Sequence, residues 1–108
     1  MPHVALPPDF EGSRDATPED LKSLPAISQQ AVHVLESCIA EHHFAEIDYI
    51  TSEGRQETIR LRPAFIRYNT THHIVVWGFP VGADHWIQLW LDRIAGVRDT
   101  GDVFEPTW

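Results

Sequence analysis

The sequence contains a single cysteine, Cys38, so it cannot form a disulfide within the chain. Small domains in oxidising compartments often depend on several disulfides, and their absence favours a reducing compartment. The opening residues, MPHVALPP, also lack the basic segment and long apolar run of a secretory signal peptide. We therefore expect the protein to be cytoplasmic.

Long hydrophobic runs and basic residues are also scarce. The longest apolar stretch, Ile74–Val81, includes a glycine and a proline and is far shorter than the roughly 20 residues that span a bilayer. Acidic residues outnumber Lys and Arg by 16 to 8, which gives a formal net charge of -8. Because this charge repels polyanions at long range, we expect neither membrane insertion nor non-specific nucleic-acid binding.

Motifs for catalysis and metal binding are missing too. There is no Gly-rich phosphate loop and no serine nucleophile motif, so we expect no enzyme activity and no cofactor. The histidine pairs His42-His43 and His72-His73 suggest a metal site completed by His85 or Cys38, but adjacent strand residues face opposite ways and no metal-binding spacing occurs. Cys38 lies on the apolar face of a predicted helix, where burial suppresses the thiolate. We expect no metal site and no reactive thiol.

What the sequence does contain is enough apolar material for one domain, since 43% of its 108 residues are hydrophobic. Residues 1–26 hold five of the eight prolines and no sustained period, which predicts an irregular acidic arm that lies over the domain surface. One short helical turn is expected there, capped by Thr17 ahead of Pro18, with Glu19 and Asp20 in its first turn. We place the domain at 27–104 and a tail at 105–108.

An amphipathic helix is predicted over residues 28–43, with Ser28 as its N-cap. Apolar residues recur there at the three-and-four spacing of one helical face, namely Ala31, Val34, Leu35, Cys38 and Ile39.

After this helix, the apolar period drops to two, as in Ile47 and Tyr49, which indicates half-buried strands. Pro63 is expected to end the second strand because it has no amide to donate. Further strands are predicted at His73–Phe79, His85–Leu91 and Ile94–Asp99. The sequence thus predicts an α+β fold that is mainly β, with one N-terminal amphipathic helix packed on a small, five-stranded bent sheet or barrel.

The order of four segments resembles the WYL domain family over about 65 residues, from Ile39 to Val103. These segments are Ile47-Asp48-Tyr49, Arg60-Leu61-Arg62-Pro63, Ile74-Val75-Val76 and Leu91-Asp92-Arg93-Ile94. The last is the sharpest, because residues 89–94 (LWLDRI) keep four positions of the family's Phe-Arg-Leu-Asp-Arg-Ile-like string. The resemblance implies an Sm-like or SH3-like barrel that senses nucleotide or nucleic-acid ligands, usually behind a helix-turn-helix in bacterial transcription regulators. Without that DNA-binding segment, we expect a standalone module that acts through a partner.

The sequence departs from the family's pattern at two places. The Trp-Tyr-Leu triplet that names the family falls on His73-Ile74-Val75, and the first Arg of the late motif falls on Trp90. Trp90 replaces a charge-assisted phosphate contact with a flat apolar surface, which can stack on a base or a partner but cannot neutralise an anion.

The best candidates for an anion site are Arg60, Arg62 and Arg67, since the first two lie two apart on one strand and point to the same face. Alternatively, these arginines are solvated and pair with Glu46, Asp48 or Glu57 across the sheet. Arg93 either pairs with Asp92 to tie the last strand to the barrel or, by resemblance, contacts a ligand with Tyr49 as a neighbour.

An aromatic stripe of Trp86, Gln88 and Trp90 is predicted to face outward and to form a binding or oligomer surface, unless the arm or the helix covers it. Two functions follow. The first is a WYL-like sensing module that binds a nucleotide-like or other anionic effector and signals to a regulator protein. The second is a protein-interaction or dimerisation module with no small ligand.

Overall fold

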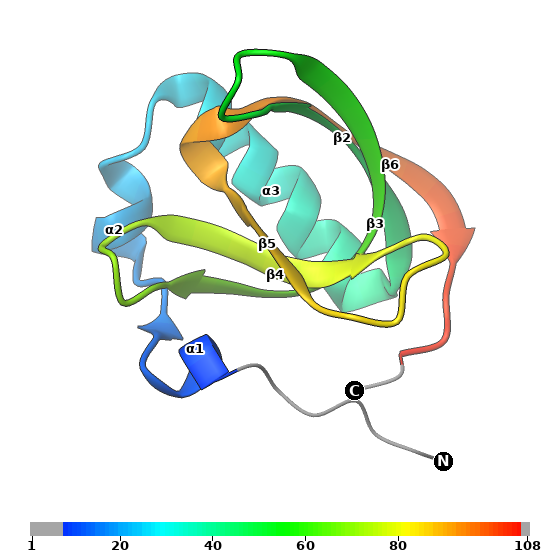
Figure 1. Cartoon of the computed structure of the whole chain (residues 1–108), viewed down its shortest axis with the longest axis horizontal. Coiled ribbons are helices and arrows are strands. Elements are labelled where there is room, and N and C mark those ends of the chain that lie inside the picture. The colour runs from blue at the N-terminus through cyan, green and yellow to red at the C-terminus, as the bar shows by residue number, and fades with distance from the viewer. Residues whose placement is uncertain (1–7, 107–108) are drawn as a thin grey trace.

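The computed structural model describes residues 8–106, so residues 1–7 of the predicted arm and 107–108 of the predicted tail lie outside the described part. Its elements are, in chain order, α1 (Pro8–Glu11), β1 (Arg14–Asp15), α2 (Pro18–Lys22), α3 (Ala26–Glu41), β2 (His43–Ile50), β3 (Gln56–Tyr68), β4 (Ile74–Pro80), β5 (Ile87–Trp90), the 3-10 helix η1 (Leu91–Arg93) and β6 (Ile94–Val103). The fold is mainly β with one long helix, as the sequence predicts (Figure 1).

The sheet is antiparallel and has six strands rather than the predicted five. The strand order is β5-β4-β3-β2-β6, and β1 pairs with β3 outside this path. In β1, Arg14 lies opposite Tyr68 and Asp15 lies opposite Arg67. The prediction missed β1 because a strand of two residues in a proline-rich arm shows no alternation and is formed only by its long-range partner.

Strand β3 passes through Pro63, so the prediction that Pro63 ends the strand is wrong. The first half of β3 pairs with β2 and the second with β4, and Leu61 faces both Ala45 and Pro80. A register shift between Pro63 and Phe65 marks a bulge, which accommodates a residue without an amide hydrogen and bends the strand. Opposite this bend, a Cβ on Gly78 would lie 2.4 Å from the Arg62 carbonyl oxygen, so only glycine allows the close approach of β4.

Helix α3 begins at Ala26, two residues before the predicted start. Pro25 occupies the N-cap position, and Ser28, the predicted cap, is instead a buried residue within the first turn. The helix ends at His42, whose left-handed backbone (φ 56°) turns the chain into β2. Its buried face includes Ala31, Leu35 and Cys38 but also Val32, which the sequence pattern missed, whereas Val34 and Ile39 are half-buried.

The main core lies between α3 and the sheet, and Cys38 belongs to it together with Leu35, Ile47 and Leu61. Burial raises the pKa of the Cys38 thiol to about 11. The prediction of a core cysteine with a suppressed thiolate is therefore confirmed.

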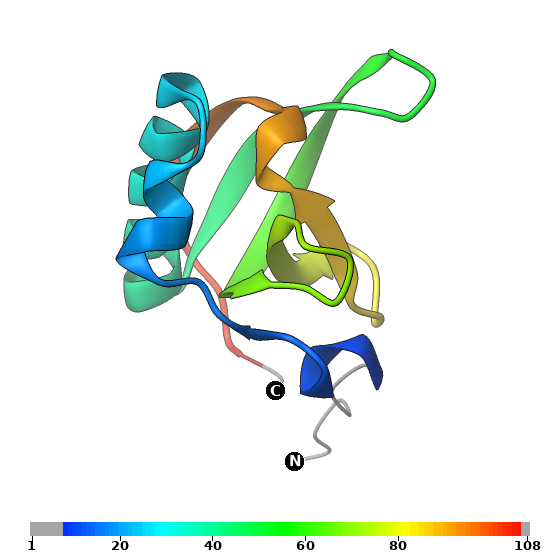
Figure 2. The same cartoon turned by 90° about the vertical axis from the view of Figure 1, so that its left-hand side faces the viewer.

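The described part of the arm is more ordered than predicted. Helix α2 has the expected Thr17 cap, whose hydroxyl accepts a hydrogen bond from the Asp20 amide while the Asp20 carboxylate accepts one from the Thr17 amide. The Arg14 guanidinium and the Thr17 amide hold the pKa of the Asp20 carboxyl well below its ordinary value. The arm runs from α1 beneath the sheet through β1 to α2 at the start of α3 (Figure 2).

Helix α3 packs against β6, β2 and β3 on one side of the sheet, as the two views show (Figures 1 and 2). Other apolar side chains are buried outside this core: Val75, Trp77 and Phe79 on β4. Within residues 8–106, no helix has the length and apolar character needed to cross a membrane.

Candidate functional site

The three arginines predicted to form an anion site are not gathered in one place. Arg60 forms an ion pair with Asp102 (2.6 Å) and lies 3.7 Å from Glu46, which is one of its predicted cross-strand partners. Arg62 donates to the carbonyl oxygens of Pro80 and Ala83, at 3.3 and 2.7 Å, and so holds the turn after β4.

Arg67 is held by the arm. Its guanidinium lies 2.7 Å from the Asp15 carboxylate, donates to Ser13 and sits 4.2 Å from the centre of the Phe10 ring. Each of the three arginines therefore contacts a different segment, and Arg67 lies seven positions after Arg60 along β3, up to about 23 Å away when the strand is extended. Each of the three therefore has partners within the described chain.

The predicted stripe on β5 divides into two different environments. Trp86, just before the strand, packs edge-on against Phe79 (4.4 Å between ring centroids) and lies 5.8 Å from Phe65, which Phe10 of the arm covers. The Gln88 side chain accepts a hydrogen bond from the buried Asn69. Trp86, Gln88 and Trp90 are all half-buried, so the stripe is not a flat apolar surface.

The other end of β5 borders a hollow of about 390 Å³, which we call the Trp90 hollow. This volume lies in the lower part of the range of about 300–1,000 Å³ typical of small-molecule sites. The residues around it come from β2, the β2–β3 turn, β3, β5 and η1, and the hairpin and η1 lie toward the same end of the sheet (Figures 1 and 2). Its lining consists of Tyr49, Thr51, Ser52, Glu57, Ile59, Leu89, Trp90 and Arg93. The structure thus brings together three of the predicted ligand residues, Tyr49, Trp90 and Arg93.

Trp90 is held in place by His73, which stands where the family has the Trp of its Trp-Tyr-Leu triplet. His73 stacks on its indole with ring centroids 3.7 Å apart and 16° between the planes. The amide of Trp90, at the outer edge of β5, donates to the Tyr49 hydroxyl at 3.1 Å. The hydroxyl satisfies a backbone donor that would otherwise be open to another strand. The stack on His73 orients the indole, and the hydrogen bond to Tyr49 holds the Trp90 backbone.

Arg93 carries the only positive charge in the lining of this hollow. The guanidinium carbon lies 5.0 Å from the centre of the Trp90 ring. No ion pair joins Arg93 to Asp92 or to any other described residue, so the predicted Asp92 pairing does not form. Glu57 supplies the one carboxylate of the lining, on the exposed part of β3. The lining therefore offers an aromatic surface, one cation and one carboxylate.

Sequence reasoning missed His73, Glu57 and the hydroxyl residues Thr51 and Ser52. Glu57 lies directly opposite Tyr49 in the β2–β3 register, and this pairing could have been found by closing the hairpin around the Ser52-Glu53-Gly54 turn. The contact between His73 and Trp90 carries no local signal. In the described chain, no three side chains of His, Cys, Asp or Glu gather as they would around a metal ion.

Comparisons with known proteins bear on the fold. Neither a scan against protein-family models nor a search of curated proteins found a match. Among solved structures, the chain is similar to proteasome accessory factor B/C (PafBC) of Arthrobacter aurescens, with a TM-score of 0.66 and 13% sequence identity. The similarity covers 75% of this chain and 13% of that chain, so this chain spans a small part of PafBC. The C-terminal region of PafBC has a WYL domain, and the shared fold is consistent with the WYL-like fold that the motif order predicts.

Proposed function

We propose that this chain is a WYL-like ligand-sensing module whose effector site is the Trp90 hollow. The observation that carries the proposal is the convergence of Tyr49, Trp90 and Arg93, which lie on three separate elements, in one hollow. The sequence predicts each of them as a ligand residue, by resemblance or by chemistry, and carries no information on their proximity. The other predicted arginines are engaged elsewhere, which leaves Arg93 as the effector's cation.

The lining favours a ligand with a planar ring and an acidic group. Such a ring would contact the indole of Trp90, and an anionic group would accept charge-assisted hydrogen bonds from Arg93. Glu57 would accept from an N–H group on the ring. A nucleotide-like effector has all three features, and a single Arg suits one phosphate better than a polyanionic strand.

The wider role that we propose follows from the family resemblance. A helix before an antiparallel sheet in the order β5-β4-β3-β2-β6, with a 3-10 turn between β5 and β6, supports an Sm-like barrel. In the family that the chain resembles, such modules serve transcription regulators. We therefore propose that effector binding is passed to a regulator protein, with the β2–β3 hairpin and η1 as the elements nearest the ligand.

The test is an NMR titration of the ¹⁵N-labelled chain with a panel of nucleotides and short single-stranded oligonucleotides, at low and physiological salt. We expect shifts at Tyr49, Glu57, Trp90 and Arg93 that weaken as salt rises. The variant Arg93→Gln should lose at least about tenfold in affinity, the value of one hydrogen bond to a charged group.

Arg60→Gln is the matched control, because Arg60 was also predicted as a ligand residue but lies outside the hollow lining. It should bind as the wild type does. If no compound shifts the hollow, or if Arg60→Gln loses binding while Arg93→Gln keeps it, the proposed site is wrong. Self-association that Trp86 or Trp90 variants abolish would instead favour the interaction module.

A further inference from the structure

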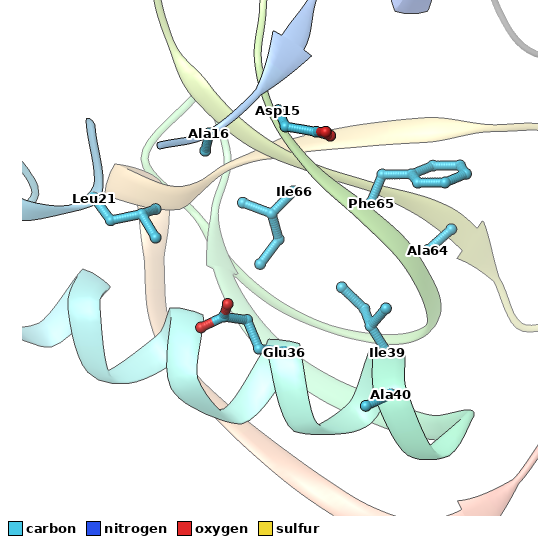
Figure 3. Close-up of a pocket in the computed structure, with 9 residues that line it drawn as sticks. All are labelled: Asp15, Ala16, Leu21, Glu36, Ile39, Ala40, Ala64, Phe65 and Ile66. Carbon is cyan, nitrogen blue, oxygen red and sulfur yellow. The ribbon is translucent and has the colours of Figure 1, made fainter. Parts of the chain in front are cut away.

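A second hollow lies between the arm, α3 and β3, away from the Trp90 hollow. It has a volume of about 380 Å³ and is lined by the nine residues labelled in Figure 3, most of them apolar. Ile39 projects from α3 toward β3, where Ala64, Phe65 and Ile66 form the opposite wall (Figure 3). We call this space the arm hollow, because Asp15, Ala16 and Leu21 of the arm complete it.

A further hollow of about 290 Å³ continues along α3 toward its N-terminus. It lies between α2 and α3 and shares Leu21 and Glu36 with the arm hollow. The two hollows are therefore neighbours along α3, with one leucine and one carboxylate in both linings. Together they form a groove along α3, which we call the α3 groove, with apolar surface on either side of Glu36.

Charge in the α3 groove is concentrated at this junction. The arm hollow is lined by two carboxylates, Asp15 and Glu36, and by no Lys, Arg or His. Asp15 is already paired with Arg67, whereas Glu36 forms no ion pair with a described residue. Figure 3 shows the Glu36 carboxylate directed from α3 toward Leu21 and Ile66. Lys22 and His33 line the far hollow only. Glu36 is an exposed residue of α3, so a cation beside it would meet a solvated carboxylate next to the apolar walls of the hollow (Figure 3).

We propose that the α3 groove binds a peptide segment of a partner protein in which one Lys or Arg stands between two apolar side chains. The basic side chain pairs with Glu36, and the apolar neighbours occupy the hollows on either side. A net charge of -8 on the whole chain also attracts basic segments. Because the arm supplies one wall, an occupied groove stabilises the docked arm.

The proposal can be tested with three synthetic peptides: acetyl-Leu-Arg-Leu-amide, its Gln counterpart and its Glu counterpart. In NMR titrations of the full chain, the Arg peptide should shift amides at Glu36, Ile39 and Ala40. It should bind about two- to fivefold tighter than the Gln peptide, as expected for one exposed ion pair. The Glu peptide should bind most weakly.

Three variants, one of them a control, sharpen the test. Glu36→Gln should remove the preference for Arg over Gln, while Glu41→Gln, an exposed position on the same helix outside the groove lining, should keep it. Ala40→Phe fills the arm hollow from an exposed helix position and should weaken all three peptides. Equal affinity of the three peptides for the wild type, or no shift in the groove up to about 5 mM, would overturn the proposal. Self-association that Ala40→Phe abolishes would also overturn it, in favour of a second copy of this chain as the occupant.

Discussion

Trp86 and Trp90 lie four residues apart at the two ends of one short strand, and their surroundings differ completely. Trp86 packs on Phe79 and Phe65, with Phe10 of the arm behind them. Trp90 stacks on His73 and borders a hollow with Arg93 beside it. One tryptophan belongs to a small aromatic core, and the other forms part of a candidate binding site.

An alternating pattern therefore predicts on which face of a strand a side chain lies, but it does not predict which other segment covers that face. Both tryptophans were expected to face outward, and both are half-buried on the side of β5 opposite the buried Leu89. The two tryptophans differ in the segment that lies next to each end of β5. The arm lies next to Trp86, and the β2–β3 hairpin and η1 lie next to Trp90. The comparison predicts that changes at the Trp86 end affect stability and that changes at the Trp90 end affect binding.

Trp86→Ala should produce the largest loss of stability. Removing a large aromatic side chain from a core costs about 3–5 kcal/mol, and the half-exposed position of Trp86 places it at the lower end of this range. Urea unfolding followed by circular dichroism measures the loss. Trp90→Ala should cost clearly less, because one side of Trp90 borders an open hollow. Equal losses for the two variants would remove the distinction between the two ends.

Phe10→Ala should release part of the arm. Phe10 contacts the Phe65 ring (5.0 Å between centroids) and the Arg67 guanidinium, so its loss should cost about 1–2 kcal/mol because the site is at the surface. Hydrogen exchange should become faster at Ala16, whose amide donates to the Ile66 carbonyl. The amide of Trp90 serves as the internal control and should exchange at its wild-type rate. If both amides exchange faster, the arm supports the whole sheet rather than one end.

Tyr49→Phe should act at the opposite end. It removes the hydroxyl that accepts the Trp90 amide and leaves a strand-edge donor without that partner, at a cost of about 1 kcal/mol. The Trp90 amide should exchange faster, while that of Ala16 should not change. Tyr68→Phe is a control at another partly buried tyrosine, and it should leave the Trp90 amide protected.

The smallest expected effect is a loss of stability in acid through Asp48, next to Tyr49 on β2. Hydrogen bonds from Arg98 and then from Thr58 lower the pKa of Asp48 below its ordinary value of 3.8. A lowered folded-state pKa gives stability that is fully present above the ordinary pKa and lost as the pH falls through the folded one. The urea midpoint should therefore fall between about pH 5 and pH 2, and it should fall less in Asp48→Asn than in Glu41→Gln. Identical pH profiles for the two variants would contradict this role.

Elements with local signals could be predicted from the sequence. The three-and-four spacing around Leu35 gave the long helix, and Thr17 with Pro18 gave the start of α2. The period of two predicts most strand positions, but the observed ends differ from the predicted ones. Strand β5 begins at Ile87 rather than His85, and β6 runs to Val103 rather than Asp99. These features depend on residues close together in the sequence.

Features that depend on distant partners could not be predicted. Arg60 and Asp102 lie 42 residues apart, and Arg67 and Asp15 lie 52 apart, so the dispersal of the arginines carries no sequence signal. The continuation of β3 through Pro63 requires the bulge and the glycine of the neighbouring strand. The stack of His73 on Trp90 joins two positions that differ from the family's pattern. It depends on the pairing of β4 with β5, which brings Trp90 beside the start of β4.

The most direct test of the central claim is to compare the affinities of Trp90→Leu and Trp86→Phe for the tightest ligand of the nucleotide panel, in folded samples at one salt concentration. Trp90→Leu should lose at least about fivefold in affinity, since base–aromatic stacking contributes about 1–3 kcal/mol, and Trp86→Phe should bind within about twofold of the wild type. If Trp90→Leu binds normally, the Trp90 hollow is not the effector site.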